Sequence, residues 1–165
     1  MDLSATPPTR PLWRRLAAVV YDLLAVVAIV MVVGLLCQLA TGGTLISTAA
    51  AVHIPVWYRP LQGIVIAAYF IASWRFGGQT LGMRPWRIRL LRQDGGRPSL
   101  QQLAIRLVVA AAPLLALSLA PLLGLRTTLW VLAVLWTSWF VPTLFDARNR
   151  ALHDFAAGTE IRRIN

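Results

Sequence analysis

The chain has 165 residues, of which 58% are hydrophobic and 13% charged, and its net charge is +10. A soluble domain of this length cannot enclose so much apolar material, so the composition excludes an ordinary soluble fold and predicts one membrane domain. The only cysteine, Cys37, excludes an internal disulfide.

The chain begins with a polar, proline-rich segment, residues 1–12, which we predict to be a disordered cytoplasmic tail ahead of a membrane domain at 13–165. An apolar stretch follows at 16–40. It is too long for the core of a cleaved signal peptide, and Asp22 interrupts it, so we expect a retained helix. A bilayer core of about 30 Å needs about 20 apolar residues in a helix. Three more stretches approach this length: 56–76, 103–125 and 129–145.

The arginines alternate between the ends of these stretches. Fourteen of the 16 basic residues, all of them arginines, lie before the first stretch, between the second and third, or after the fourth. Only Arg59 and Arg126 fall in the other two loops. The positive-inside rule therefore predicts an all-α protein with four spans, with both termini and the loop 77–102 in the cytoplasm. The same clustering indicates contact with anionic lipid head groups and not with nucleic acid.

The central loop contains a pattern typical of a strand. Residues 86–91 alternate apolar and basic side chains with period two, and a turn sequence, Gln-Asp-Gly-Gly, follows at 93–96. Residues 159–164 form a second extended candidate. Neither segment can form a sheet alone, so we predict that the two pair as a small β cap. The competing interpretation of 86–91 is an amphipathic helix on the membrane surface.

Asp22 lies about two turns inside the first stretch, where a lone carboxylate is unfavourable. It must be protonated, paired or in contact with water. The predicted topology brings Arg15, Arg75 and Arg106 into the same leaflet, and we expect a salt bridge from Asp22 to one of them, with Arg106 the first choice. Two interpretations of this intramembrane polar cluster stay open. It is a buried ion pair that sets helix register, or a site for an ion, a proton or an anionic group.

His153 and Asp154 lie side by side near the C-terminus. No nucleophile and no set of metal ligands accompanies them, so the sequence predicts no enzyme, no metal and no cofactor. We expect Asp154 to accept hydrogen bonds from backbone or arginine donors in the loop 78–82, and so to fasten the end of the chain to that loop.

These positions together resemble the RDD family of small bacterial membrane proteins. In that family an arginine precedes an aspartate by seven residues, the central loop reads GQTLGK, and the end reads L-H-D followed by G-T. This chain departs from the pattern at Met83, where the family usually has lysine. The matching positions are Arg15, Asp22, Gly78, Gln79, Thr80, Gly82, Arg106, His153, Asp154, Gly158 and Thr159.

The resemblance implies a multi-pass protein of the bacterial inner membrane with both termini cytoplasmic. It suggests transport of an ion or small ligand without supplying a substrate. The alternative is a non-catalytic scaffold or assembly factor that binds a membrane partner through its cytoplasmic face. The expected partners are the bilayer with its anionic head groups and either further copies of the chain or another membrane protein.

Overall fold

A computed structural model describes residues 12–43, 45, 54–146 and 148–164. The tail predicted at 1–12 lies outside the described residues, apart from Leu12, which begins the first helix. The described chain is mostly helical and contains one two-stranded antiparallel sheet. The elements are α1 (Leu12–Ala40), α2 (Tyr58–Ala72), the π-helical turn η1 (Ser73–Gly77), β1 (Ile88–Arg92), α3 (Leu100–Ala111), the 3₁₀ segment η2 (Ala112–Leu119), α4 (Ala120–Leu123), α5 (Leu125–Ser138), α6 (Pro142–Phe145), α7 (Leu152–Ala157) and β2 (Thr159–Arg163).

Three helical stretches among the described residues are long and apolar enough to cross a membrane: Leu12–Ala40, Leu100–Leu123 and Leu125–Phe145. Their most apolar windows are only 0%, 22% and 11% buried within the chain, so most of their apolar surface faces outward, as it does in helices solvated by lipid. The remaining predicted stretch, 56–76, corresponds to α2 and η1.

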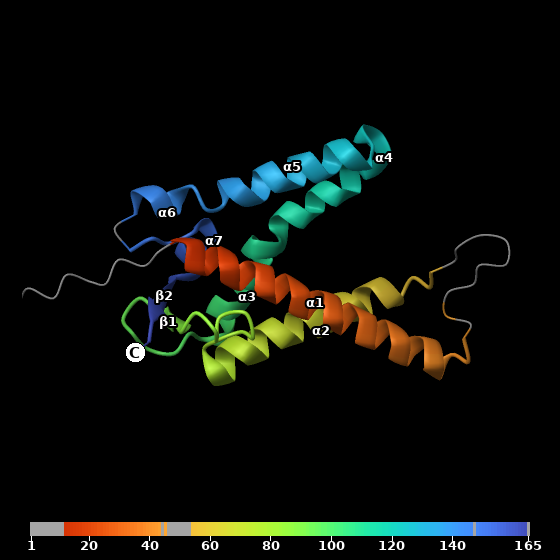
Figure 1. The fold of residues 1–165 in the computed structure, drawn as a ribbon, viewed down its shortest axis with the longest axis horizontal. Coiled ribbons are helices and arrows are strands. Elements are labelled where there is room, and N and C mark those ends of the chain that lie inside the picture. The colour runs from red at the N-terminus through yellow and green to blue at the C-terminus, as the bar shows by residue number, and fades with distance from the viewer. Residues whose placement is uncertain (1–11, 44, 46–53, 147, 165) are drawn as a thin grey trace, which may run out of the picture.

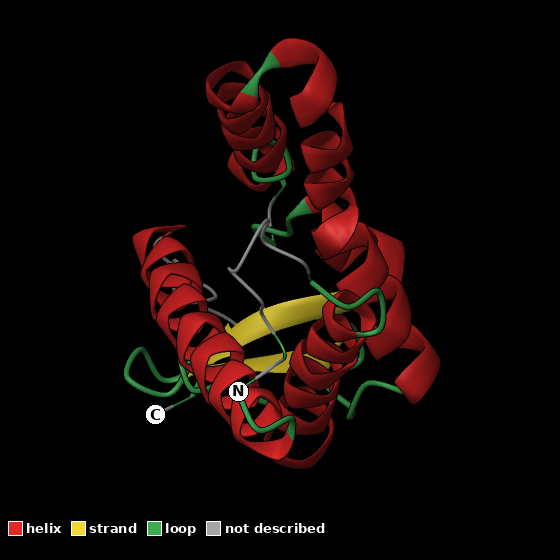
Figure 2. Ribbon diagram, turned by 90° about the vertical axis from the view of Figure 1, so that its right-hand side faces the viewer, coloured by secondary structure: helices red, strands yellow, loops and turns green. Residues whose placement is uncertain are grey.

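Long helices run back and forth, and the sheet gathers at one end of them (Figure 1). Helix α2 returns beside α1, and α5 returns along η2 and α4. The start of α1, the end of η1, the start of α3 and the short helix α7 therefore meet around the strands. In Figure 2 the two strands lie side by side, with helices flanking them on both sides. This end of the molecule is hereafter the cap.

Pro113 explains why the third stretch is not a continuous α-helix. Proline lacks the N–H that would bond to the carbonyl of Val109, and the chain tightens into the 3₁₀ segment η2 from Ala112 onward. The indole of Trp139 donates a hydrogen bond of 2.9 Å to the same carbonyl from the end of α5. The irregular backbone is thereby tied to the neighbouring helix, which is how membrane proteins accommodate a proline inside a span.

The strand pairing predicted from the period-two pattern is confirmed. Strands β1 and β2 are antiparallel, with Ile88 opposite Arg163 and Arg92 opposite Thr159. The amphipathic-helix interpretation of 86–91 is wrong. The strand begins two residues later than predicted because Arg87 has a φ of 51°, which belongs to a turn and not to extended backbone.

The buried core of the described residues lies where this sheet meets the helices. Leu90 of β1 and Leu103 of α3 are both fully buried. Helix α3 can begin close beneath the strands because Ser99 and Gln102 form a reciprocal cap, in which each side chain accepts a hydrogen bond from the other's backbone N–H. The other members of the core cluster are Ala18, Trp74, Met83 and Ile88.

Candidate functional site

Asp154 forms the centre of a buried ionic cluster in the cap. Its side chain is fully buried, and it accepts a hydrogen bond from Arg15 Nη2 at 2.5 Å and another from Arg106 Nη1. Arg106 also donates to the hydroxyl of Thr159 at 3.0 Å, and Arg15 donates to the carbonyl of Asn149. One carboxylate therefore joins α1, α3 and the C-terminal segment.

The position of Asp154 follows from its place in a short helix. It lies in the first turn of α7, and its carboxylate accepts a hydrogen bond of 2.9 Å from the backbone N–H of Ala151. A carboxylate at a helix N-terminus satisfies a free backbone donor and interacts favourably with the helix dipole. Gly158 ends the helix with a φ of 62°, a left-handed conformation that glycine adopts without strain, and the chain enters β2 directly.

Burial and the neighbouring charges shift the pKa values of Asp154 and His153. Burial would raise the pKa of Asp154, but the positive charges of Arg106 and Arg15 outweigh burial and hold that pKa well below its ordinary value. Burial, with a further contribution from Arg106, lowers the pKa of His153 from 6.5 to about 3. At neutral pH the cluster therefore holds an ionised aspartate, two arginines and a neutral histidine.

Asp22 lies in α1 and has a different set of partners. It accepts hydrogen bonds from the hydroxyl of Thr80 at 2.6 Å, from the backbone N–H of Gly82 at 2.9 Å and from the hydroxyl of Tyr69 at 3.2 Å. Tyr69 in turn accepts a hydrogen bond of 3.1 Å from the backbone N–H of Leu81. All three donors to Asp22 are neutral, and the central loop supplies two of them.

Gly82 is required for this approach of the loop to α1. A Cβ atom at this position would overlap the backbone oxygen of Ala18 and lie 2.7 Å from the backbone nitrogen of Asp22. Those obstacles are backbone atoms, which cannot rotate away. Gly78 has another role, because its φ of 67° ends the π-helical turn and its carbonyl accepts a hydrogen bond of 2.7 Å from Leu90.

The intramembrane polar cluster expected from the sequence divides into separate parts. The predicted salt bridge between Asp22 and Arg106 is wrong, since Arg106 and Arg15 both pair with Asp154 and no ion pair among the described residues includes Asp22. Arg75 lies in η1 with an exposed side chain and joins neither aspartate. The donors that we expected for Asp154 in the loop 78–82 bind Asp22 instead.

The remaining motif residues support the cap. Gln79 donates a hydrogen bond of 2.8 Å to the carbonyl of Ile88, the first residue of β1. The carbonyl of Gly158 accepts a hydrogen bond from Gln102 at 3.5 Å. Met83, at the position where lysine is usual, is buried in the core cluster. A methionine suits this apolar setting, and the site needs no cation there.

Tyr69 is a site residue that sequence reasoning missed. A hydroxyl-bearing side chain within an apolar stretch was the available signal, because a buried hydroxyl needs a hydrogen-bond partner. Within the described residues, no three His, Cys, Asp or Glu side chains come together as a metal-binding group.

Comparison with known proteins places these residues in a family context. The model of the RDD family matches residues 9–158, which include Arg15, Asp22, Arg106 and Asp154. No curated protein matches the chain. No solved structure matches it either.

Proposed function

The chain belongs to the RDD family, and we propose that it carries an ion or small ligand across the bacterial inner membrane with Asp22 as the binding carboxylate. The observation that carries this proposal is the set of neutral donors around Asp22. Its three hydrogen-bond donors are two hydroxyls and one backbone N–H, and no arginine among the described residues forms an ion pair with it. An ionisable side chain inside a membrane span marks an ion or proton pathway more often than a structural contact.

The hydroxyls of Tyr69 and Thr80 suit transport of either a proton or a metal cation. A hydroxyl can pass a proton to or from a carboxylate, and hydroxyl and carboxylate oxygens are ligands for hard cations. Asp154 could serve neither purpose, because two arginines occupy its oxygens. Transport through this protein is therefore expected to depend on Asp22 and not on Asp154 chemistry.

The proposed topology has four spans with both termini in the cytoplasm. Helix α2 with η1 would be the second span, and the cap would lie on the arginine-rich cytoplasmic side. Reporter fusions at Gly43, Arg92, Arg126 and Asn165 should read outside, inside, outside and inside. A periplasmic reporter at Arg92 would contradict the four-span topology.

The test of transport is a flux assay on purified protein in liposomes, with Na⁺, K⁺ and proton gradients in separate arms. Asp22→Asn should lower flux of the carried species by about ten- to hundredfold, the equivalent of one lost charge-assisted contact. The matched control is Asp94→Asn, which removes an equal charge from a carboxylate that is 57% exposed and lies in a turn of the cap. Control flux should equal that of wild type. Full flux in a folded Asp22→Asn protein would contradict the proposal.

A second candidate is a non-catalytic scaffold, alone or as a homo-oligomer. It is favoured by the outward-facing apolar surface of the three long helices. At most 22% of the most apolar segment of each helix is buried within the chain. Apolar helix surfaces can pack against another membrane helix as well as against lipid. A scaffold would show no flux in any arm, would keep its partner after Asp22→Asn, and would be cross-linked in the membrane through its spans.

A further inference from the structure

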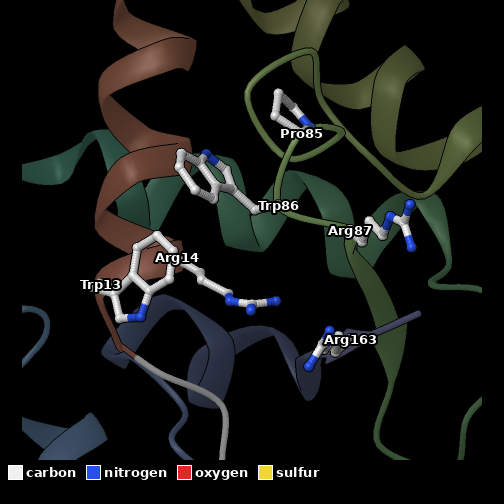
Figure 3. A pocket seen from close by; sticks show the side chains of 6 residues that line it. All are labelled: Trp13, Arg14, Pro85, Trp86, Arg87 and Arg163. Atoms are coloured by element: carbon white, nitrogen blue, oxygen red, sulfur yellow. The ribbon is translucent and has the colours of Figure 1, made fainter. Parts of the chain in front are cut away.

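The cap contains a pocket that is lined by neither Asp22 nor Asp154. Its volume is about 290 Å³, and it opens between the start of α1, the turn before β1 and the end of β2. In Figure 3 the guanidinium of Arg14 extends from α1 toward Arg163, with Trp86 above them. The lining residues are Trp13, Arg14, Pro85, Trp86, Arg87 and Arg163.

The pocket has positive charge that the described residues do not balance. Three of its six lining residues are arginines and none is acidic. The described ion pairs use other arginines, so Arg14, Arg87 and Arg163 have no carboxylate partner within the described chain. Such a cluster attracts an anion, and the planar guanidinium matches a phosphate in particular.

Two hydrogen-bond donors at the pocket are buried without an acceptor. Arg14 Nε and Trp86 Nε1 each lack a hydrogen-bond partner among the described residues. A buried donor left unpaired is unfavourable, and native structures contain few of them. Both atoms are covered by the protein, so a ligand in the pocket would be bound by the outer guanidinium nitrogens and not by these two donors.

The backbone at the edge of the pocket is strained. Arg87 has a φ of 51°, which non-glycine residues rarely adopt. Hydrogen bonds from Arg87 to the carbonyl of Arg84 at 3.0 Å, and from Ile164 to the carbonyl of Arg87 at 2.9 Å, hold this turn. Strained conformations of this sort persist where the surroundings fix them, and they concentrate at binding sites.

The pocket is lined by aromatic residues of the kind that gather at the membrane surface. Trp13 is 52% exposed, and its ring meets Trp86 edge to face at a centroid distance of 5.0 Å. Tyr21, further along α1, contacts the same Trp86 ring at 6.0 Å. Tryptophan and tyrosine gather where head groups begin, and arginines next to them contact anionic lipid.

We propose that this pocket binds one phosphate ester between the guanidinium groups of Arg14 and Arg163. A phospholipid head group and a soluble phosphate compound share this chemistry. The inference is independent of transport, because none of the three hydrogen-bond donors of Asp22 lines the pocket.

The experiment titrates delipidated full-length protein in detergent and measures binding by native mass spectrometry and by the shift in melting temperature. The probes are phosphatidylglycerol, phosphatidylcholine and inorganic phosphate. Arg14→Gln and Arg163→Gln should each weaken phosphatidylglycerol binding by about tenfold, as expected for loss of a charge-assisted hydrogen bond.

The matched control is Arg97→Gln, which removes one positive charge from an exposed arginine elsewhere in the loop. Its affinity should equal that of wild type, and all three arginine variants should melt within a few degrees of wild type without ligand. Tight binding of phosphatidylglycerol alone identifies a lipid site. Competition by inorganic phosphate identifies soluble phosphates as the ligand class. Equal losses of phosphatidylglycerol affinity in Arg97→Gln and Arg14→Gln would show diffuse charge attraction and overturn the proposal. Unchanged affinity in the pocket variants would overturn it as well.

Discussion

The two aspartates Asp154, fully buried, and Asp22, partly buried, have opposite kinds of hydrogen-bond donor. Asp154 faces two arginines, and its oxygens are occupied by charged donors from α1 and α3. Asp22 faces Tyr69, Thr80 and Gly82, which are all neutral donors. The first arrangement pairs the carboxylate with positive charge and holds distant segments together, whereas the second satisfies the carboxylate with uncharged donors alone. This difference is why the proposed function assigns ligand binding to Asp22 and a structural role to Asp154.

The largest effect is expected from breaking the Asp154 cluster. Asp154→Ala leaves Arg15 and Arg106 buried without a counter-charge, and it should lower the free energy of unfolding by about 3–5 kcal/mol. Thermal melting in detergent would measure the loss. The Asp94→Asn protein serves as the control, since its carboxylate is exposed. A melting temperature equal to that of wild type would contradict the structural role of Asp154.

The hydrogen bonds of Asp22 should be broken by Gly82→Ala, a substitution that changes no charge. Gly82→Ala forces the loop away from α1, because the new methyl group meets backbone atoms, and it should cost about 3 kcal/mol. Gly77→Ala is the matched control, since a methyl group there meets nothing within 4 Å. Both proteins would be compared by chemical denaturation. Equal stability of the two variants would show that the loop does not pack on α1 at Gly82.

The Asp154 cluster should also respond to acid through His153. The folded-state pKa of about 3 lies below the ordinary value of 6.5, so between these pH values the unfolded chain binds a proton that the folded chain does not. Stability therefore falls as the pH is lowered, by about 2 kcal/mol between pH 7 and pH 5. His153→Gln should flatten this part of the stability curve. Below pH 4, protonation of Asp154, whose pKa is also lowered, should add a further loss in both proteins.

The smallest effect sharpens the difference between the two centres. Tyr69→Phe removes one of three donors to Asp22 and should cost about 1 kcal/mol, because Thr80 and Gly82 remain. The same variant should alter the pH dependence of flux if the hydroxyl passes protons. A loss as large as that of Asp154→Ala would mean that the Asp22 centre is also a structural lock.

The sequence predicted the strand pairing and failed on the partners of the aspartates, for a physical reason. Alternation with period two specifies an extended segment and its two faces, so 86–91 and 159–164 could be matched without knowing the helices. Hydropathy and arginine counts specify only how deep a residue lies along the membrane normal. An equal expected depth for Asp22 and Arg106 did not reveal their directions: Asp22 bonds to the central loop, whereas Arg106 bonds to Asp154.

The partner of Arg15 lies 139 residues further along the chain, and this separation affects how the protein is made. At a synthesis rate of about 5–20 residues per second, about 7–28 seconds pass between the emergence of the two residues. During that interval the early helices reach the membrane while Arg15 and Arg106 still await their counter-ion. Completion of the fold thus depends on the final segment, α7 and β2, and a chain that stops before Asp154 keeps two uncompensated arginines by which quality-control proteases can recognise it.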